Sequence, residues 1–483
     1  MASVNKQSLR EEFATLKGQF ERLSAEGKVN AEIRALVQAL LMLFELIMAV
    51  FMEKTTPKNS SNSGIPPSQT DKDETTPPQT GAKGKGKNDN DERPENIRSV
   101  ETVTIAKVDT CETCGADLSD TPCHEQERRT LIDILFEKVE SHVDAEIKEC
   151  PHCHTRNKGT FPEAMFGPLQ YGPGIKAFIL NLVIAQMLSL KRVQQSLMAL
   201  IGKIISEATI LHYVWQLHSA LEVWEQAAIK QLLNEPTIHV DETSLRVDKK
   251  KQWIHVYSGG EITLKFLHPK RGQAAIEAIG IIPRYGGVII HDCWSAYLSY
   301  AHCDHGLCGS HLLRELTFIV EANAYSWAIE MKRLLQKTCA TISKRKNKCL
   351  TPLEYRALCR HYRNILKRAE KELPPIPARQ NGKRGRIAKS DAHNLWERMK
   401  KHRDAILLFA KVPHVSFTNN RAERDLRMSK VKQKISGCFR TERYANAYCR
   451  ISSYLQTMAN QGYNPLVAIQ KALSGKIYAE GGE

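Results

Sequence analysis

The chain has 483 residues, a formal net charge of +16 at pH 7 and an isoelectric point near 9.2. This length suits two or three domains, and the charge favours a polyanionic partner such as nucleic acid, although ribosomal and membrane-surface proteins share it. The most apolar run, residues 40–52, is interrupted by Glu45 and falls short of the ~20 residues that span a bilayer, and a signal-peptide pattern is absent. These features argue against a membrane or secreted protein, so we expect a soluble, cytoplasmic one.

Residues 1–54 have the apolar spacing of a coiled coil. Large apolar side chains recur every three or four residues before Gly27 and again after it. An apolar seam of this kind is buried only against a partner helix. We therefore predict a coiled coil that makes the protein a homo-oligomer. A helical hairpin folded against the rest of the chain is the alternative.

Residues 55–98 change to Pro, Ser, Asn, Gly, Lys and Asp, with almost no large apolar side chains. A segment of this composition cannot bury enough surface to offset the entropy that it loses on ordering. We predict a flexible linker that is solvated, with non-specific phosphate contact as the alternative.

Residues 99–165 contain two Cys-x-x-Cys pairs, Cys111 with Cys114 and Cys150 with Cys153. Two such pairs present four thiolates to one tetrahedral Zn²⁺. The 13 cysteines of the chain do not form the short framework of a secreted protein, which argues against disulfides. We predict a zinc-finger domain with a structural Zn²⁺. Redox-active thiols and unliganded cysteines are the competing interpretations.

Residues 166–234 have helical periodicity throughout. A helix, a turn at Gly202 and a second helix capped by Ser206 resemble a helix-turn-helix DNA-binding domain. The segment that would be the recognition helix, residues 207–212, is poor in Arg and Lys, which usually read the DNA groove. A helical bundle with a packing role is therefore the alternative.

Residues 235–445 contain two acids at the ends of apolar, strand-like runs. These runs, at 237–240, 252–257, 262–267 and 287–291, with a helix at 273–279, follow the order of a ribonuclease H-like domain. The first run ends on Asp241 and the fourth on Asp292. Because the first and fourth strands are neighbours in that sheet, the two carboxylates should lie side by side. We therefore expect a multidomain chain whose catalytic core is α/β and ribonuclease H-like with a mixed sheet, preceded by the coiled-coil, zinc-binding and helical domains.

A third acid, Glu423, stands in a basic segment that we expect to be helical. The cations that follow it are Arg424, Arg427, Lys430 and Lys434. Carboxylates can hold divalent ions against scissile phosphates, and neighbouring cations can bind the phosphate backbone. The segment therefore favours metal-dependent DNA chemistry. A salt bridge between Glu423 and Arg427, one helical turn apart, is the alternative.

The stretch between Asp292 and Glu423 is longer than this fold requires, and its periodicity predicts an α-helical insertion at about 320–400. A loop within it contains Lys383, Arg384 and Arg386. We expect this loop to contact the DNA backbone, with a solvated surface as the alternative. Residues 446–483 are predicted to form a helical tail that packs against the rest of the chain.

Together these motifs resemble those of the DDE transposases of the insertion-sequence-sixty-six family. The chain shows the zipper-like start, the Asn-Ser-Ser-Asn-Ser and Pro-Pro linker, the double Cys-x-x-Cys finger, and the Asp-Glu-Thr, Asp-x-Trp-Ser-Ala-Tyr, Cys-x-x-His and Asn-Asn-x-x-Glu-Arg boxes. The resemblance implies an enzyme that cleaves DNA and transfers the strands of its own insertion element, with Asp241, Asp292 and Glu423 as its triad. It also implies DNA partners at the terminal repeats and the target, a bacterial nucleoid location, and room for accessory proteins.

The resemblance gives supporting roles to Cys308, His311, Asn419 and Asn420. Two Mg²⁺ ions, or Mn²⁺ in their place, would be held by the triad, where they would activate the attacking hydroxyl and stabilise the leaving oxygen. Glu242 should face the opposite side of its strand from Asp241, so it is excluded from the ligands.

Three points stay open. The cluster His302, Cys303, His305, Cys308 and His311 has spacings that would allow another zinc. The family more often has glycine where this chain has Cys293. The rival functions are a non-catalytic, zinc-dependent DNA-binding protein and a ribonuclease H-like nuclease or resolvase.

Overall fold

The structure, a computed structural model, describes residues 6–63, 102–134, 138–163, 165, 167–376 and 389–476. The chain divides into two compact units, one formed by Met1–Lys85 with Gln226–Gln433 and the other by Gly86–Glu225 with Lys434–Glu483. Most of the predicted linker lies outside the described residues, as do Lys383, Arg384 and Arg386 of the predicted DNA-contacting loop.

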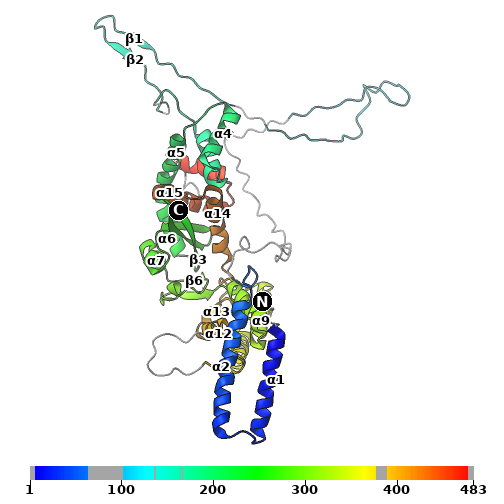
Figure 1. The fold of residues 1–483 in the computed structure, drawn as a ribbon. Helices are drawn as coiled ribbons and strands as arrows, with labels where there is room; N and C mark the ends of the chain where they lie inside the picture. The colour runs from blue at the N-terminus through cyan, green and yellow to red at the C-terminus, as the bar shows by residue number, and fades with distance from the viewer. Residues whose placement is uncertain are drawn as a thin grey trace, which may run out of the picture. The chain divides into compact units, whose positions relative to one another are not determined.

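The first unit begins with a helical hairpin. Helices α1 (Lys6–Ala25) and α2 (Ala31–Thr55) lie side by side (Figure 1), and Asn30 caps α2 by accepting a hydrogen bond from the backbone of Ile33. The rings of Phe13 and Phe44 stack at 5.1 Å between the helices. The apolar seam is thus partly covered within one chain, as in the hairpin alternative. Self-association through the exposed apolar side chains that remain, such as Leu16, Leu36 and Leu40, stays a prediction.

The C-terminal end of α2 packs against helix α9 (Gly309–Asn323). Leu46, Ala49 and Met52 are buried there, and the carboxylate of Glu53 accepts hydrogen bonds from the backbone of Ala392 and the side chain of Asn323, both at 3.0 Å. By length and composition α2 could cross a membrane. In this structure one end of it belongs to the folded unit.

Residues 57–63 form a hydrogen-bonded turn that docks on α9. Asn62 is only 2% exposed; its amide donates to Pro57 at 3.0 Å and to the carboxylate of Glu321 at 2.6 Å. Asn59 accepts a hydrogen bond from the backbone of Ser61 at 2.9 Å, which shapes the turn. These residues therefore belong to the folded unit, in contrast to the prediction of a flexible linker from residue 55.

A five-stranded mixed sheet forms the centre of this unit, in the order β5-β4-β3-β6-β7. Its pairs β3–β4 and β4–β5 are antiparallel, and β3–β6 and β6–β7 are parallel. Every strand expected from the sequence is present, and α7 (Gln273–Ile279) stands between the third and the fourth. The strands are β3 (Thr237–Val247), β4 (Lys250–Gly259), β5 (Ile262–His268), β6 (Val288–His291) and β7 (Asp304–Leu307).

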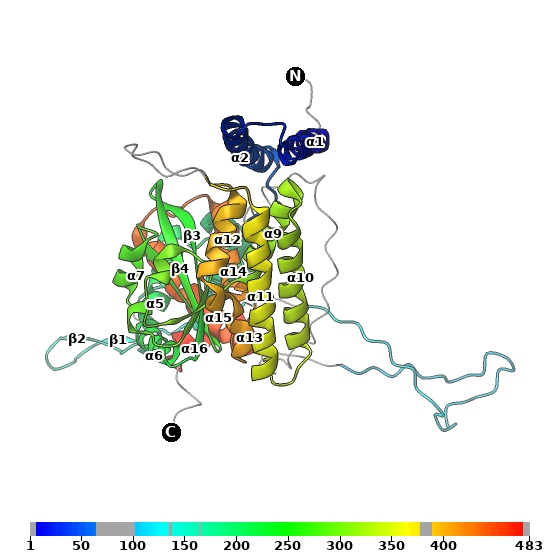
Figure 2. The same ribbon diagram turned by 90° about the horizontal axis from the view of Figure 1, so that it is seen from below.

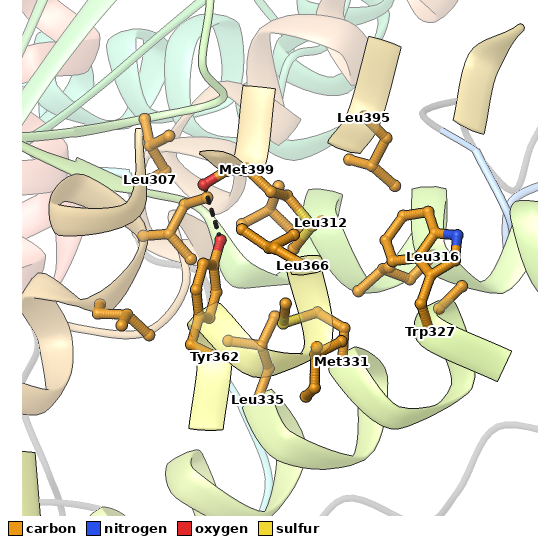
Figure 3. Close-up of a cluster of buried hydrophobic side chains, with 14 of the residues drawn as sticks. Leu307, Leu312, Leu316, Trp327, Met331, Leu335, Tyr362, Leu366, Leu395 and Met399 are labelled. Carbon is orange, nitrogen blue, oxygen red and sulfur yellow. Dashed lines mark hydrogen bonds between the residues drawn. The ribbon is translucent and has the colours of Figure 1, made fainter. Parts of the chain in front are cut away.

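Among the described residues, five helices lie within 309–376 and 389–411, where the sequence predicts a helical insertion at about 320–400. After α9 they are α10 (Ser326–Ser343), α11 (Pro352–Glu372), α12 (Asp391–Lys401) and α13 (Arg403–Lys411). Figure 2 shows α10, α11 and α12 side by side. Their shared core contains Leu316, Met331 and Leu395 among other apolar side chains, and the Tyr362 hydroxyl within it donates to the carbonyl of Met399 at 3.0 Å (Figure 3).

The core of the second unit is helical. It packs the C-terminal helices α15 (Glu442–Asn460) and α16 (Pro465–Leu473) with α3 (Pro173–Leu180) and α5 (Glu207–Ala220), and it also contains α4 (Leu190–Ile201). A buried ion pair at 2.8 Å joins Arg450 of α15 to Glu225 at the start of α6 (Glu222–Leu233). Gly202, in the left-handed conformation, ends α4, and Ser206 caps α5, which gives the turn that the sequence predicts.

Candidate active site

The sheet brings Asp241 and Asp292 to the same level of neighbouring strands. Thr237 pairs with Val288 in the parallel β3–β6 ladder, and each acid lies four residues further along its own segment. Burial, then the charges of neighbouring acids that include Asp292 and Glu423, raises the pKa of Asp241 to about 8. The largest of these charges is that of Glu242, the next residue in the chain, and Asp292 and Glu423 also lie near enough to Asp241 to add to the effect.

Glu423 is carried on the first turn of α14 (Asn420–Ser436), and Asn419 anchors this turn to the sheet. Asn419 is 1% exposed. Its amide donates to the carbonyl of Val240 at 2.8 Å, and its Oδ1 lies 3.0 Å from Nδ1 of His239. Its backbone N–H donates to Sγ of Cys308 at 3.2 Å. One side chain thus links α14 to the residue of β3 that precedes Asp241.

His311 and Cys308 face Glu423 from the start of α9. The Nδ1 atom of His311 is 3.7 Å from Oε1 of Glu423, and the ligand atoms of all three residues lie within 4.8 Å of one another. A hydrogen bond with Cys308 raises the pKa of His311 to about 9, which favours an imidazolium next to the carboxylate. This trio could hold a metal ion, or His311 could supply the positive charge itself.

The other members of the Cys/His cluster turn elsewhere. His302 lies 3.1 Å from the carbonyl of Ile282, and the thiol of Cys303 donates to the carbonyl of Tyr285 at 3.0 Å. His305 is 3.1 Å from the ring of His291. Within the described residues this stretch therefore does not assemble a metal site of its own.

Glu242, the residue next to Asp241, has partners of its own. Its carboxylate accepts hydrogen bonds from Arg271 at 2.7 Å and from the hydroxyl of Tyr297 at 2.5 Å, and its side chain is only 1% exposed. These contacts fit the expected exclusion of Glu242 from the metal ligands, which stays a prediction. Arg271 and Tyr297 thus satisfy the carboxylate of Glu242, although its charge still acts on Asp241.

Asp425 is a structural acid that sequence reasoning missed. Its carboxylate is buried and accepts hydrogen bonds from Ser258 at 2.7 Å and Thr263 at 2.9 Å, which fixes α14 on strands β4 and β5. It stands inside the basic run, between Arg424 and Leu426, and nothing in that pattern marks it as a buried acid.

Arginines surround Glu423 in an open hollow of about 430 Å³. Arg424 and Arg427, expected to bind DNA, line it together with Asn420; the structure adds Arg314 and Arg421. Of the other predicted contacts, Lys430 donates to the carbonyl of Ser244 on β3 at 3.2 Å, and Lys434 is exposed. The hollow thus places positive charge around one of the three acids.

Cys293, which follows Asp292, has a φ of +71°, a backbone conformation that favours glycine. Cys293→Gly is expected to be more stable than Cys293→Ala by about 1 kcal/mol, because both variants remove the thiol but only glycine escapes the left-handed strain. Thermal unfolding of the two variants would measure the difference. An alanine variant as stable as the glycine variant would contradict this account.

The two Cys-x-x-Cys pairs each occupy a local turn. The N–H of Gly115, in the left-handed conformation, donates to the carbonyl of Cys111 at 2.9 Å. At the second turn, the backbone N–H of Cys150 donates to the carbonyl of Thr155 at 3.0 Å. Strands β1 (Ile147–Glu149) and β2 (Arg156–Lys158) lie on either side of this turn. In the part of the chain that the structure describes, Cys111, Cys114, Cys150 and Cys153 do not converge on one point. The zinc finger therefore stays a prediction.

Two acids on neighbouring strands of a mixed sheet, with a third acid among arginines, are groups expected of an enzyme that acts on nucleic acid. Residues 168–447 match the family described as Transposase IS66 family. The match covers more than half of the chain, so the chain belongs to this family, which confirms the resemblance. No curated protein is significantly similar to it. Membership implies a transposase role, DNA binding and the use of a divalent metal, as expected.

Proposed function

We propose that the chain catalyses metal-dependent cleavage and strand transfer of the DNA of its own element, with Asp241, Asp292 and Glu423 as the catalytic acids. The observation that carries this proposal is the parallel register of β3 and β6, in which Asp241 and Asp292 follow paired strands at the same level, while Asn419 holds the turn of Glu423 against Val240. A site that binds cations typically holds several carboxylates close together, although their negative charges repel one another.

The strand arrangement supports a ribonuclease H-like core. Three antiparallel strands in sequence are followed by a helix and by two strands that run parallel to the first, in the order β5-β4-β3-β6-β7. The order of the apolar runs predicts the first four of these strands, and this order supports a position for the first acid beside the second.

The donor set fits Mg²⁺, or Mn²⁺ as a substitute, because hard cations prefer carboxylate oxygens. Oε1 of Glu423 is buried and lacks a hydrogen-bond partner among the described residues, which leaves an oxygen available to a cation. Two bound ions would activate the attacking hydroxyl and stabilise the leaving oxygen. The protein's own part is to hold Asp241, Asp292 and Glu423 together.

Phosphate binding is proposed for the arginines of the hollow. Arg314, Arg424 and Arg427 lie beside Glu423, where they could orient a DNA backbone next to the acids. Further proposals are a structural Zn²⁺ on the four knuckle cysteines, self-association through the N-terminal hairpin, and DNA contact by the helix-turn-helix-like region. Accessory proteins of the element would act beside these contacts.

The test is cleavage of a plasmid that carries both ends of the element, with the purified chain and Mg²⁺. Wild-type protein is expected to nick or cut at the ends and to give strand-transfer products, whereas Asp292→Ala and Glu423→Ala should lose at least a hundredfold in rate. Asp404→Ala, which removes an exposed acid on α13, is the matched control.

The rival functions predict different products. End binding without any cleavage would indicate the non-catalytic DNA-binding protein, and cleavage without strand transfer would indicate a nuclease or resolvase. Full activity of Glu423→Ala would remove this residue from the triad.

A further inference from the structure

Cations and indole rings alternate in a row beside the acids, which we call the cation–aromatic row: Lys251, Trp253, Arg271 and Trp294. The ammonium of Lys251 lies 4.7 Å from the ring centroid of Trp253. The guanidinium of Arg271 lies 5.1 Å from the same ring and 4.3 Å from that of Trp294. Three separate segments thus meet: strand β4, the loop after β5 and the loop after β6.

The row adjoins the candidate catalytic acids. The backbone N–H of Trp294 donates to the carboxylate of Asp292 at 3.1 Å. Arg271 binds Glu242, the residue next to Asp241. The row is also reachable from solvent, because Lys251 is exposed, both indoles are half-buried and the Arg271 side chain is 41% exposed.

Packing of Glu242 accounts for only part of this arrangement. Arg271 and Tyr297 satisfy its carboxylate, and the ring of Trp294 packs edge-on against that of Tyr297 at 5.6 Å. Neither indole is among the hydrogen-bond donors to this carboxylate in the described residues. Burial of one acid does not require two large indoles that remain partly exposed to water, each beside a cation. Partly exposed aromatic side chains interleaved with cations are instead typical of surfaces that bind single-stranded nucleic acid.

We propose that the cation–aromatic row binds unpaired DNA next to the scissile phosphate. Its indoles stack on nucleobases, and Lys251 and Arg271 neutralise the adjoining phosphates. Single-stranded DNA fits better than duplex, because a base inside a duplex already has both faces stacked and offers none to an indole. The proposal rests on the proposed function, since the DNA strand that the row binds is the strand that the acids would cut.

The test compares two labelled oligonucleotides of equal length, one of thymidines and one of abasic sites, which carry the same phosphates with and without bases. Binding is measured by fluorescence anisotropy with the full-length protein in EDTA, so that cleavage plays no part. Wild-type protein should prefer the thymidine strand. Trp253→Ala and Trp294→Ala should each lose about tenfold in affinity for it, since stacking contributes roughly 1–3 kcal/mol per base, and should bind the abasic strand as wild type does.

Trp396→Ala is the matched control, because Trp396 also lies under a lysine, Lys400 at 4.7 Å, but on helix α12. Trp294→Phe keeps an aromatic face and should retain part of the thymidine preference even if Trp294→Ala is poorly folded. An unchanged preference in both alanine variants, or an equal loss for both strands, would overturn the proposal. Because EDTA abolishes metal-dependent cleavage, a wild-type protein that prefers thymidine but never cuts with Mg²⁺ would refute the catalytic proposal alone.

Discussion

Asp241→Asn is expected to abolish DNA cleavage and, at the same time, to stabilise the metal-free protein. The pKa of Asp241 is raised from 3.8 to about 8 by burial and by the neighbouring acids. Asparagine keeps an oxygen that can accept the hydrogen bond of the Glu242 backbone, 2.8 Å long in the wild type, and it removes the charge. The same repulsion that would prepare the site for cations is therefore a cost to the fold without them.

The stabilisation should depend on pH. Because the folded pKa of Asp241 lies above the unfolded value, the carboxyl group takes up a proton on folding between about pH 4 and pH 8. Its cost to stability is absent below pH 4, grows as the pH rises through this window and levels off above pH 8. At pH 7 we expect Asp241→Asn to raise the free energy of unfolding by on the order of 2 kcal/mol. This is less than the whole pKa shift would give at about 1.4 kcal/mol per pKa unit.

Thermal unfolding in EDTA at several pH values would measure this difference between wild type and Asp241→Asn, with cleavage assayed in parallel. Asp425→Asn is the contrasting control, because that buried carboxylate accepts two hydroxyl hydrogen bonds and its loss should lower the Tm. A lower Tm for Asp241→Asn than for wild type at neutral pH would contradict this prediction. It would show that other groups in the folded protein already offset the negative charge of the acids. Added Mg²⁺ should raise the Tm of wild type more than that of the variant.

The strands that carry the acids could be predicted because their signal is local. Each is a short β-branched, apolar run, and the 237–240 and 287–291 runs end on carboxylates. Strand β7 gives no such signal: its residues, Asp304–Leu307, are mostly polar or small, and it forms only where β6 offers a parallel edge. The pairing of β3 with β6 followed from the order of the elements.

Residues 57–63 are predicted from the sequence to be part of a flexible linker, but they form a folded turn. Asn and Ser have the composition of a solvated linker, and composition does not reveal that Asn62 is buried on Glu321 of α9. Short polar side chains that bond their own backbone can build a compact turn with no apolar residue. The contacts of Asn419 and Asp425 were hidden for a related reason, since each joins residues more than 150 positions apart.

Asn419→Ala is the second change for which we expect a large effect. It removes the amide that donates to Val240 and the oxygen beside His239, while the backbone bond to Cys308 can persist. Two buried polar groups would lose their partner, which costs about 1–3 kcal/mol for each group left unsatisfied. The first turn of α14 would also lose its side-chain link to β3, so Glu423 should lie less accurately beside Asp241.

A displacement of that kind costs about a hundredfold in rate when it reaches 1 Å. Cleavage by Asn419→Ala, measured well below its Tm, should fall by about that factor and should need more Mg²⁺ for half-maximal rate, because the ligands would be less well arranged. Thr418→Ala changes a neighbouring side chain of the same loop and leaves these hydrogen bonds in place. Stability alone cannot mimic the metal requirement: a variant that melts earlier but cleaves with the rate and Mg²⁺ dependence of wild type would mean that Asn419 holds the fold and does not position Glu423.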